Sequence, residues 1–128
     1  MDLYHEAILD HYKHPHHWGV LNPADIDYEE NNPLCGDKLR LTMRIKDGKI
    51  AELAWSGAGC AISQASASML GEELIGKTLE EARAITKEDV LELLGIELGP
   101  VRLKCALLSL KVMKVGVYGI AGWTDQER

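Results

Sequence analysis

The stretch from residue 38 to residue 56, KLRLTMRIKDGKIAELAWS, decides the fold class. Apolar and polar side chains alternate over residues 38–46, which predicts a strand with one face toward the core and the other toward water. Asp47-Gly48 favours the positive φ angles of a tight hairpin turn, and residues 50–56 are predicted to return as the partner strand. The apolar face of the first strand comprises Leu39, Leu41, Met43 and Ile45.

Helical patterns lie on both sides of this hairpin along the chain. Residues 2–14 are predicted to form a helix that ends at Pro15, and a short extended piece follows at 26–28. A helix rich in small residues is predicted to begin near Cys60. The apolar face of the first helix comprises Leu3, Ala7, Ile8 and Tyr12.

Three further helices are predicted after residue 76. Residues 78–84 and 86–94 each begin with a threonine cap. Pro100 opens a last helix that is apolar nearly all round as far as Val117. The predicted elements are one helix, then antiparallel strands, then more helices. This order is typical of an α+β fold and not of an α/β fold with a parallel sheet. In the last helix three lysines share one sector that we expect to reach solvent: Lys104, Lys111 and Lys114.

Composition argues against several protein classes. The 128 residues suit a single domain, which we predict over residues 1–128 with a mobile tail at 121–128. A net charge of -6 without a basic stripe argues against nucleic-acid binding. No apolar run approaches the roughly 20 residues needed to cross a bilayer, and the polar start does not resemble a targeting peptide. We therefore expect no membrane partner.

The three cysteines carry most of the functional information. Their odd number prevents complete pairing within one chain, so we expect reduced thiols and a cytoplasmic location. Cys35 lies in a loop before the central strand, Cys60 at a strand-to-helix junction, and Cys105 about one turn into the last helix. Reduced cysteines can be inert core residues, metal ligands or nucleophiles.

Local charge favours a thiolate site. A helix N-terminus carries about half a positive charge, and Cys60 and Cys105 both lie near one, with Arg102 and Lys104 beside the second. Three thiolates and Asp37 would compose a tetrahedral set for zinc, and thiolates equally suit iron–sulfur clusters. Since no C-x-x-C pair occurs, spacing alone leaves unrelated core cysteines and a lone nucleophile as alternatives.

Histidines crowd the start of the chain. We favour a structural role for them over metal binding, because His14, His16 and His17 flank a proline in a segment expected to be mobile. His11 lies on the apolar side of the first helix and is predicted to be packed. The motifs of nucleotide sites, nucleophile elbows and HExxH metalloproteases do not occur.

Four segments in order resemble one family. They are DHYKHP at 10–15 with Gly19, NPLCGD at 32–37, GAGCAIS at 57–63 running on to ASAS at 65–68, and RLKC at 102–105. Over nearly the whole chain, from Leu3 to about Gly116, these segments resemble the iron–sulfur cluster assembly proteins of the IscU, SufU and NifU N-terminal type.

The resemblance implies a fold, a site and a partner. The fold is a small antiparallel sheet of about three strands with helices packed on one side. The site holds zinc or a nascent [2Fe–2S] cluster, and the partner is a pyridoxal-phosphate cysteine desulfurase that hands over persulfide sulfur for delivery to apo iron–sulfur proteins. Cys35 is the expected sulfur acceptor, with Cys105 as the alternative. The implied ligands are Cys35, Asp37, Cys60 and Cys105.

Departures from the family pattern leave the subclass open. Scaffolds of the IscU type carry histidine before the third cysteine, whereas this chain has Lys104, as SufU-like proteins do. SufU-like proteins carry an insertion before that cysteine, which this chain lacks between Gly76 and Pro100. Residues 98–102, LGPVR, replace the LPPVK that a dedicated chaperone recognises, which puts that partner in doubt.

Three functions follow from this pattern. The first is a cluster scaffold or sulfur acceptor with Asp37 as a labile ligand, and it is favoured over a conventional enzyme. The second is a zinc-dependent sulfurtransferase that stimulates the desulfurase. Besides the sulfur acceptor, Lys104 and Arg102 are candidate catalytic residues. The third is a structural zinc domain that only binds partners.

Overall fold

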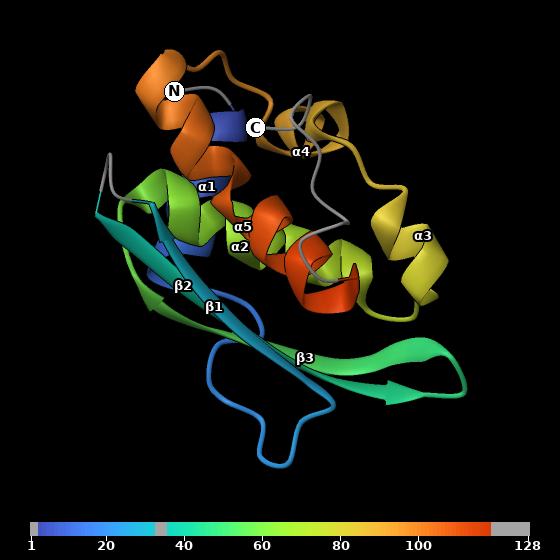
Figure 1. Cartoon of the computed structure of the whole chain (residues 1–128). Coiled ribbons are helices and arrows are strands. Elements are labelled where there is room, and N and C mark those ends of the chain that lie inside the picture. The colour runs from blue at the N-terminus through green and yellow to red at the C-terminus, as the bar shows by residue number, and fades with distance from the viewer. Residues whose placement is uncertain (1–2, 33–35, 119–128) are drawn as a thin grey trace.

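A computed structural model describes residues 3–32 and 36–118, so Cys35 and the predicted tail at 121–128 lie outside the described residues. The described part contains one sheet and a set of helices (Figure 1). In chain order the elements are α1 (Leu3–Lys13), β1 (Ile26–Asn32), β2 (Asp37–Lys46), β3 (Lys49–Ala58), α2 (Ala61–Leu74), α3 (Leu79–Arg83), α4 (Lys87–Leu94) and α5 (Pro100–Tyr118).

The strands form one antiparallel sheet in the order β1-β2-β3, and the predicted hairpin is confirmed as its β2-β3 half. Asp47 and Gly48 take φ angles of 54° and 75°, which suit a turn between right-handed twisted strands. β1 is longer than the predicted piece at 26–28, because pairing with β2 continues as far as Asn32.

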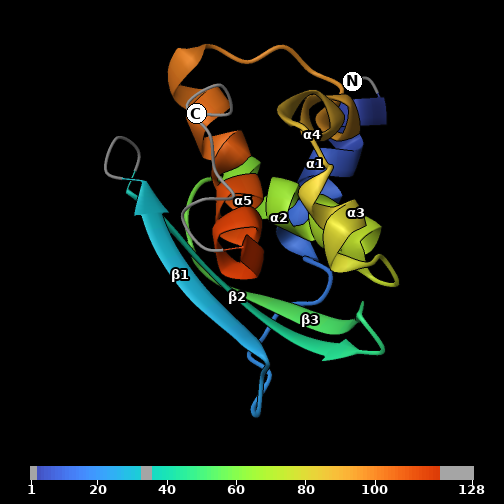
Figure 2. The ribbon, with the colours of Figure 1, turned by 45° about the vertical axis from the view of Figure 1, so that its right-hand side comes forward.

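The helices lie on one side of the sheet, as Figures 1 and 2 show, which confirms the predicted α+β architecture. The core sits between β2-β3 and the central helices α2 and α5. Leu39, Leu41 and Met43 of β2 are fully buried in it. The small residues of α2 allow close contact with α5, where Ser66 Oγ donates a hydrogen bond of 2.6 Å to the carbonyl oxygen of Ala106. α2 and α5 therefore pack closely against each other.

The predicted threonine caps of α3 and α4 are confirmed. Thr78 Oγ1 accepts a hydrogen bond from the N–H of Glu81, whose carboxylate accepts one from the N–H of Thr78. Thr86 and Asp89 form the same reciprocal pair at the start of α4. These capping boxes satisfy backbone N–H groups that the helices themselves leave unpaired.

The prediction that the polar face of the central strand meets water is wrong at Thr42, which is fully buried. The segment after α1 runs along β3, where the N–H of Gly19 donates to the carbonyl of Trp55, and it then reaches the outward face of the sheet. There the N–H of Leu21 donates to Thr42 Oγ1 over 3.0 Å. Strand alternation cannot reveal a loop that covers the second face.

The expected lysine sector of α5 is also only partly correct. Lys104 is exposed, but Lys114 is buried at 3% exposure and Lys111 forms an ion pair with Glu30 of β1. The reason is that β1 runs beside this part of α5. A Cβ on Gly116 would lie 3.3 Å from the side chain of Ile26.

The apolar face of α1 is narrower than predicted. Ile8 is buried, but Tyr12 is 40% exposed. Among the described residues α1 packs mainly against α2, and this single contact covers only one stripe of the helix. Within residues 3–32 and 36–118, no helix combines the length and apolar character needed to span a bilayer.

Candidate metal centre

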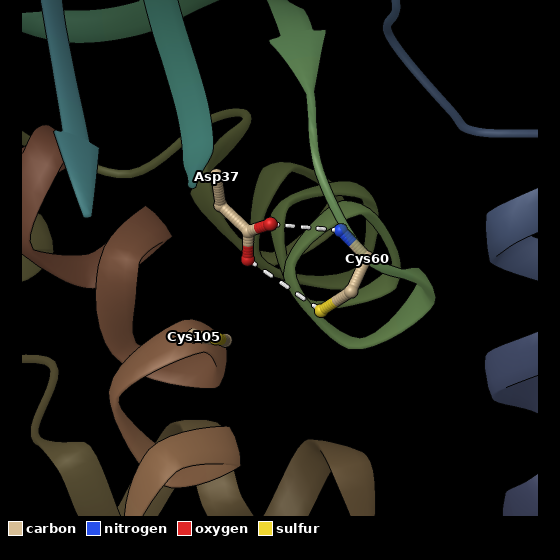
Figure 3. Close-up of side chains that lie close together, drawn as sticks. All are labelled: Asp37, Cys60 and Cys105. Atoms are coloured by element: carbon tan, nitrogen blue, oxygen red, sulfur yellow. Dashed lines mark hydrogen bonds between the residues drawn. The ribbon is translucent and has the colours of Figure 1, made fainter. Parts of the chain in front are cut away.

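Asp37, Cys60 and Cys105 come together at one end of the sheet, each from a different element. Asp37 is the first residue of β2, Cys60 immediately precedes α2, and Cys105 lies in the second turn of α5. The two sulfur atoms and a carboxylate oxygen all lie within 4.8 Å of one another (Figure 3). Residues far apart in the sequence thus present three metal-binding atoms to one point.

Asp37 is held by Cys60, which lies in the junction between β3 and α2. Its side chain is buried, and Oδ1 accepts a hydrogen bond of 2.9 Å from the backbone N–H of Cys60. Oδ2 accepts a second one from the Cys60 thiol over 3.5 Å (Figure 3). One carboxylate oxygen is thereby fixed by the backbone, while the other faces the thiols.

Cys60 occupies the N-cap position of α2, with extended backbone angles and an exposed side chain. The partial positive charge of the helix N-terminus favours negatively charged groups at this point, such as the Asp37 carboxylate. Ser63, one turn into α2, donates its hydroxyl to the carbonyl of Cys60 over 3.2 Å and lies 3.9 Å from the Cys60 sulfur. Gln64 donates to the carbonyl of Gly59 over 2.8 Å and fixes the junction.

Gly59 is required because the chain passes directly against these groups. A Cβ at this position would lie 2.6 Å from Ser63 Oγ and 2.7 Å from the carboxyl carbon of Asp37. Such distances do not occur in relaxed structures, so any side chain would displace one of the two groups. The Gly-Ala-Gly motif before Cys60 therefore serves a close approach of the backbone.

The arrangement fits a tetrahedral metal ion. Bond lengths of zinc to sulfur and oxygen place tetrahedral ligand atoms about 3.5 to 3.8 Å apart. The 3.5 Å between Cys60 Sγ and Asp37 Oδ2 already lies in that range, and the remaining separations need only a small contraction from at most 4.8 Å. Two sulfurs and a carboxylate oxygen are also donors that zinc and iron accept. This group can therefore hold a metal.

The other predicted site residues lie outside this trio. Cys35 falls outside the described residues. Arg102 and Lys104 are exposed on the first turns of α5, whereas Cys105 is 2% exposed. Ser63 and Gln64 were missed by the sequence analysis, although their spacing of three and four residues from an N-cap cysteine places them over the same turn.

The histidines lie at a different place, against the far part of α2. His11 Nδ1 is 2.7 Å from Ser68 Oγ, and burial, followed by the neighbouring His16, lowers the pKa of His11. His16 and His17 both pair with the carboxylate of Glu72. The hydrogen bond from His16 lowers the pKa of Glu72. Residues 16–17 thus have defined contacts, in contrast to the mobile segment that we expected.

Comparison with known proteins agrees with this geometry. The family described as NifU-like N terminal domain matches residues 3–125. The zinc-dependent sulfurtransferase SufU of Bacillus subtilis is 42% identical over 133 residues, covering 90% of this chain and 89% of that protein. The iron–sulfur cluster assembly scaffold protein IscU of Streptococcus pyogenes is 35% identical over 132 residues, covering 90% and 82%.

A solved structure extends the match to three dimensions. A candidate iron–sulfur cluster assembly scaffold protein for the SUF system from Fervidobacterium islandicum superposes with a TM-score of 0.76 at 29% identity, covering 88% of this chain and 94% of that one. The match to B. subtilis SufU is longer than the 128 residues present here, so that protein has residues within the matched region that this chain lacks. Because the family match spans nearly the entire chain, this protein belongs to the NifU-like N-terminal domain family, which includes the IscU and SufU proteins of iron–sulfur cluster assembly.

Proposed function

We propose that this protein works in iron–sulfur cluster assembly and holds a nascent [2Fe–2S] cluster, its cargo, on Cys35, Asp37, Cys60 and Cys105. The observation that carries the proposal is the convergence of one carboxylate and two thiols within 4.8 Å. Cysteine thiolates are the ligands that protein-bound clusters take. The exposed Cys60 beside the buried Cys105 gives the group one side from which cargo can enter and leave.

Sulfur would arrive as the outer sulfur of a persulfide on a pyridoxal-phosphate cysteine desulfurase. The thiolate of Cys35 attacks that outer sulfur, so a new S–S bond forms while the original S–S bond breaks and the desulfurase cysteine leaves as a thiolate. The exchange itself involves no net oxidation. Conversion of the transferred sulfur to the sulfide of a cluster takes two electrons per sulfur atom, which a thiol reductant would supply. Cys105 is the weaker alternative acceptor, because its burial requires the site to open before attack.

Asp37 would make the cargo releasable. A carboxylate oxygen matches a sulfide cluster less well than a thiolate does, so its bond to iron is the first to exchange. The Cys60 N–H retains the carboxylate after such a release, since it already binds Oδ1. Arg102 and Lys104 would contribute positive charge beside the thiols when an anionic sulfur carrier approaches. The recipients would be apo iron–sulfur proteins.

A second candidate function is a zinc-dependent sulfurtransferase. Lys104 favours this role, because a charged lysine cannot replace the histidine ligand of IscU-type scaffolds. The 42% identity to B. subtilis SufU also favours it. Zinc, when bound, would keep the thiols as thiolates until one of them is freed by ligand exchange. B. subtilis SufU has residues within the matched region that this chain lacks, and this difference favours the scaffold role. In either role we place the protein in the cytoplasm, where thiols stay reduced.

One experiment separates the two roles. The protein is purified without oxygen, zinc is measured, and iron, cysteine and a desulfurase are then added while visible absorption, iron and acid-labile sulfide are followed. Equal amounts of iron and sulfide, transferable to an apo-ferredoxin, would support the scaffold. Zinc that iron never displaces, together with zinc-dependent stimulation of the desulfurase, would support the sulfurtransferase.

The same assay contains the outcome that rejects both roles. A protein that holds zinc, forms no chromophore and leaves desulfurase turnover unchanged would be a structural zinc domain. The matched variants are Cys60→Ser, which removes a donor, and Ser56→Ala, which changes a partly buried residue of β3 outside the donor set. Equal behaviour of these two variants would contradict the shared site.

A further inference from the structure

Ser63 is a polar residue beside the donor group that is not itself one of the proposed ligands. It lies in the first turn of α2, its side chain is fully buried, and its Oγ is 3.9 Å from Cys60 Sγ. The hydroxyl donates to the carbonyl of Cys60 over 3.2 Å. The backbone N–H of Gln64 donates to the same carbonyl, also over 3.2 Å. The carbonyl would therefore keep a partner if the Ser63 hydroxyl turned away.

The Cys60 sulfur needs a different partner when it binds a metal. As a thiol it carries one proton, for which Asp37 Oδ2 at 3.5 Å is a nearer acceptor than Ser63 Oγ. A cysteine binds a metal as the thiolate, which has no proton and only accepts hydrogen bonds. An ionised carboxylate is also an acceptor only, so Asp37 cannot donate to that sulfur, whereas a serine hydroxyl can.

The surroundings hold the Ser63 oxygen beside this sulfur. A Cβ on Gly59 would lie 2.6 Å from Ser63 Oγ, so the backbone at Gly59 passes directly against the hydroxyl. Because the side chain has no exposed surface, bulk water does not compete for its proton. Hydrogen bonds to charged groups are stronger than neutral ones, and a local environment of low dielectric strengthens them further.

We propose that Ser63 is a positioning residue of the metal centre, whose hydroxyl turns from the carbonyl of Cys60 to its sulfur when that sulfur binds a metal. The hydroxyl proton changes direction, and the O···S separation shortens from 3.9 Å. Such a bond from outside the ligand set orients the ligand and adjusts its electron donation to the metal. The inference rests on the metal centre of the proposed function and adds one residue to it.

Cobalt(II) in place of zinc tests the proposal, because cobalt bound to thiolates absorbs light through sulfur-to-cobalt charge transfer. The full chain is loaded with Co²⁺ without oxygen, and the Co²⁺ affinity and the energy of this band are recorded for the wild type and Ser63→Ala. A hydrogen bond stabilises the sulfur electrons, so its loss should move the band to lower energy. We expect this shift together with an affinity about tenfold lower, as for loss of an outer-shell partner.

Ser68→Ala is the matched control. Ser68 is another fully buried serine of α2, and its Oγ lies 2.7 Å from both His11 Nδ1 and the backbone nitrogen of His16. Its replacement removes hydrogen bonds from the same helix away from Cys60, so the band and the Co²⁺ affinity should stay unchanged. Ser63→Thr retains the hydroxyl and should keep the band at the wild-type energy.

Thermal unfolding of the apo-proteins separates a structural role from the proposed one. Ser63→Ala is expected to fold, because the N–H of Gln64 still pairs with the carbonyl of Cys60. An unshifted band in this variant, with stability lowered as in Ser68→Ala, would mean that Ser63 only supports the helix start and would overturn the proposal. An equal shift in Ser63→Thr and Ser63→Ala would also overturn it. A wild-type protein without any sulfur-to-cobalt band would instead reject the metal centre itself, so the two failures are distinguishable.

Discussion

Acidic groups lie at both ends of α2, but their surroundings differ between the two ends. At the N-terminal end Asp37 and Cys60 meet the positive pole of the helix and a backbone N–H. At the C-terminal end Glu72 and Glu73 stand at the negative pole, and of these two only Glu72 pairs with histidines, His16 and His17. The first end is preorganised to hold anionic ligands of a metal, whereas at the second end Glu73 has no ion-pair partner among the described residues.

The largest expected effect is that of Cys105→Ser. Cys105 is buried, and a serine hydroxyl in its place is a poor ligand for zinc. Loss of a residue that only supports a ligand lowers metal affinity about 10- to 100-fold, and we expect a larger loss here. Competition with a chromophoric chelator measures the affinity. Glu73→Gln, at the other end of α2, should leave it unchanged. A zinc affinity unaffected by Cys105→Ser would remove this thiol from the site.

Gly59→Ala should have the next largest effect. The added methyl group would collide with the Asp37 carboxyl, which is one of the donors, and with Ser63 Oγ, which lies beside the Cys60 sulfur. We expect zinc affinity to fall about 10- to 100-fold. Gly99→Ala is the matched control, because nothing lies within 4 Å of a Cβ there and its φ is compatible with alanine. Equal zinc affinity in the two variants would show that the close approach at Gly59 has no bearing on the donors.

Asp37→Ala sharpens the role of the carboxylate in a scaffold. If Asp37 is the exchangeable ligand, a reconstituted cluster should decay several-fold more slowly in the variant, as followed by visible absorption. The Cys60 N–H loses its acceptor, so stability should fall by about 1 to 3 kcal/mol. Thermal unfolding of the apo-protein measures that part separately. Faster cluster decay would count against a labile Asp37.

The smallest effect concerns the two adjacent glutamates of α2. The pKa of Glu72 is lower in the folded protein than in the unfolded chain, where it is about 4.3. Ionised Glu72 therefore stabilises the fold at pH values above about 4.3, and this stabilisation is lost as the pH falls through the folded-state pKa. Glu72→Gln should therefore lower stability by about 0.2 to 1 kcal/mol at neutral pH, since the pair is largely exposed, with a difference that vanishes in acid.

Glu73→Gln provides the contrast. Removing an unpaired charge from the negative pole of α2 should leave stability equal or slightly higher at neutral pH. Denaturant unfolding at neutral and acidic pH measures both variants. Equal destabilisation by the two substitutions would mean that the histidine pairs of Glu72 carry no stability.

Local patterns were enough to predict most of the fold. Alternation and the Asp47-Gly48 turn predicted the β2-β3 hairpin, and Thr78 and Thr86 predicted their caps, because each signal and its partner lie within a few residues. The errors arose where a distant segment supplied the environment. Thr42 is covered by the segment after α1, and Lys114 lies in the sector of α5 beside β1.

The metal centre shows the same division. The residue types, the helix N-termini and the glycines before Cys60 could be recognised in the sequence. The proximity of Asp37, Cys60 and Cys105 was predicted only through the family resemblance and not by any local pattern, because 23 residues separate the first pair and the three elements meet only in the folded protein. The pairing of Glu72 with His16, 56 residues away, left no local signal either.

The different burial of the two thiols has a kinetic consequence. An incoming atom can reach Cys60 from solvent, whereas Cys105 is buried and is reached only when the structure around it opens. The bond to Cys105 would therefore be the last to form and the last to break. Residence time on the protein would then depend on how often this part of the structure opens, in addition to the exchange of the Asp37 bond. Relative rates of alkylation at the two cysteines would measure this opening frequency directly.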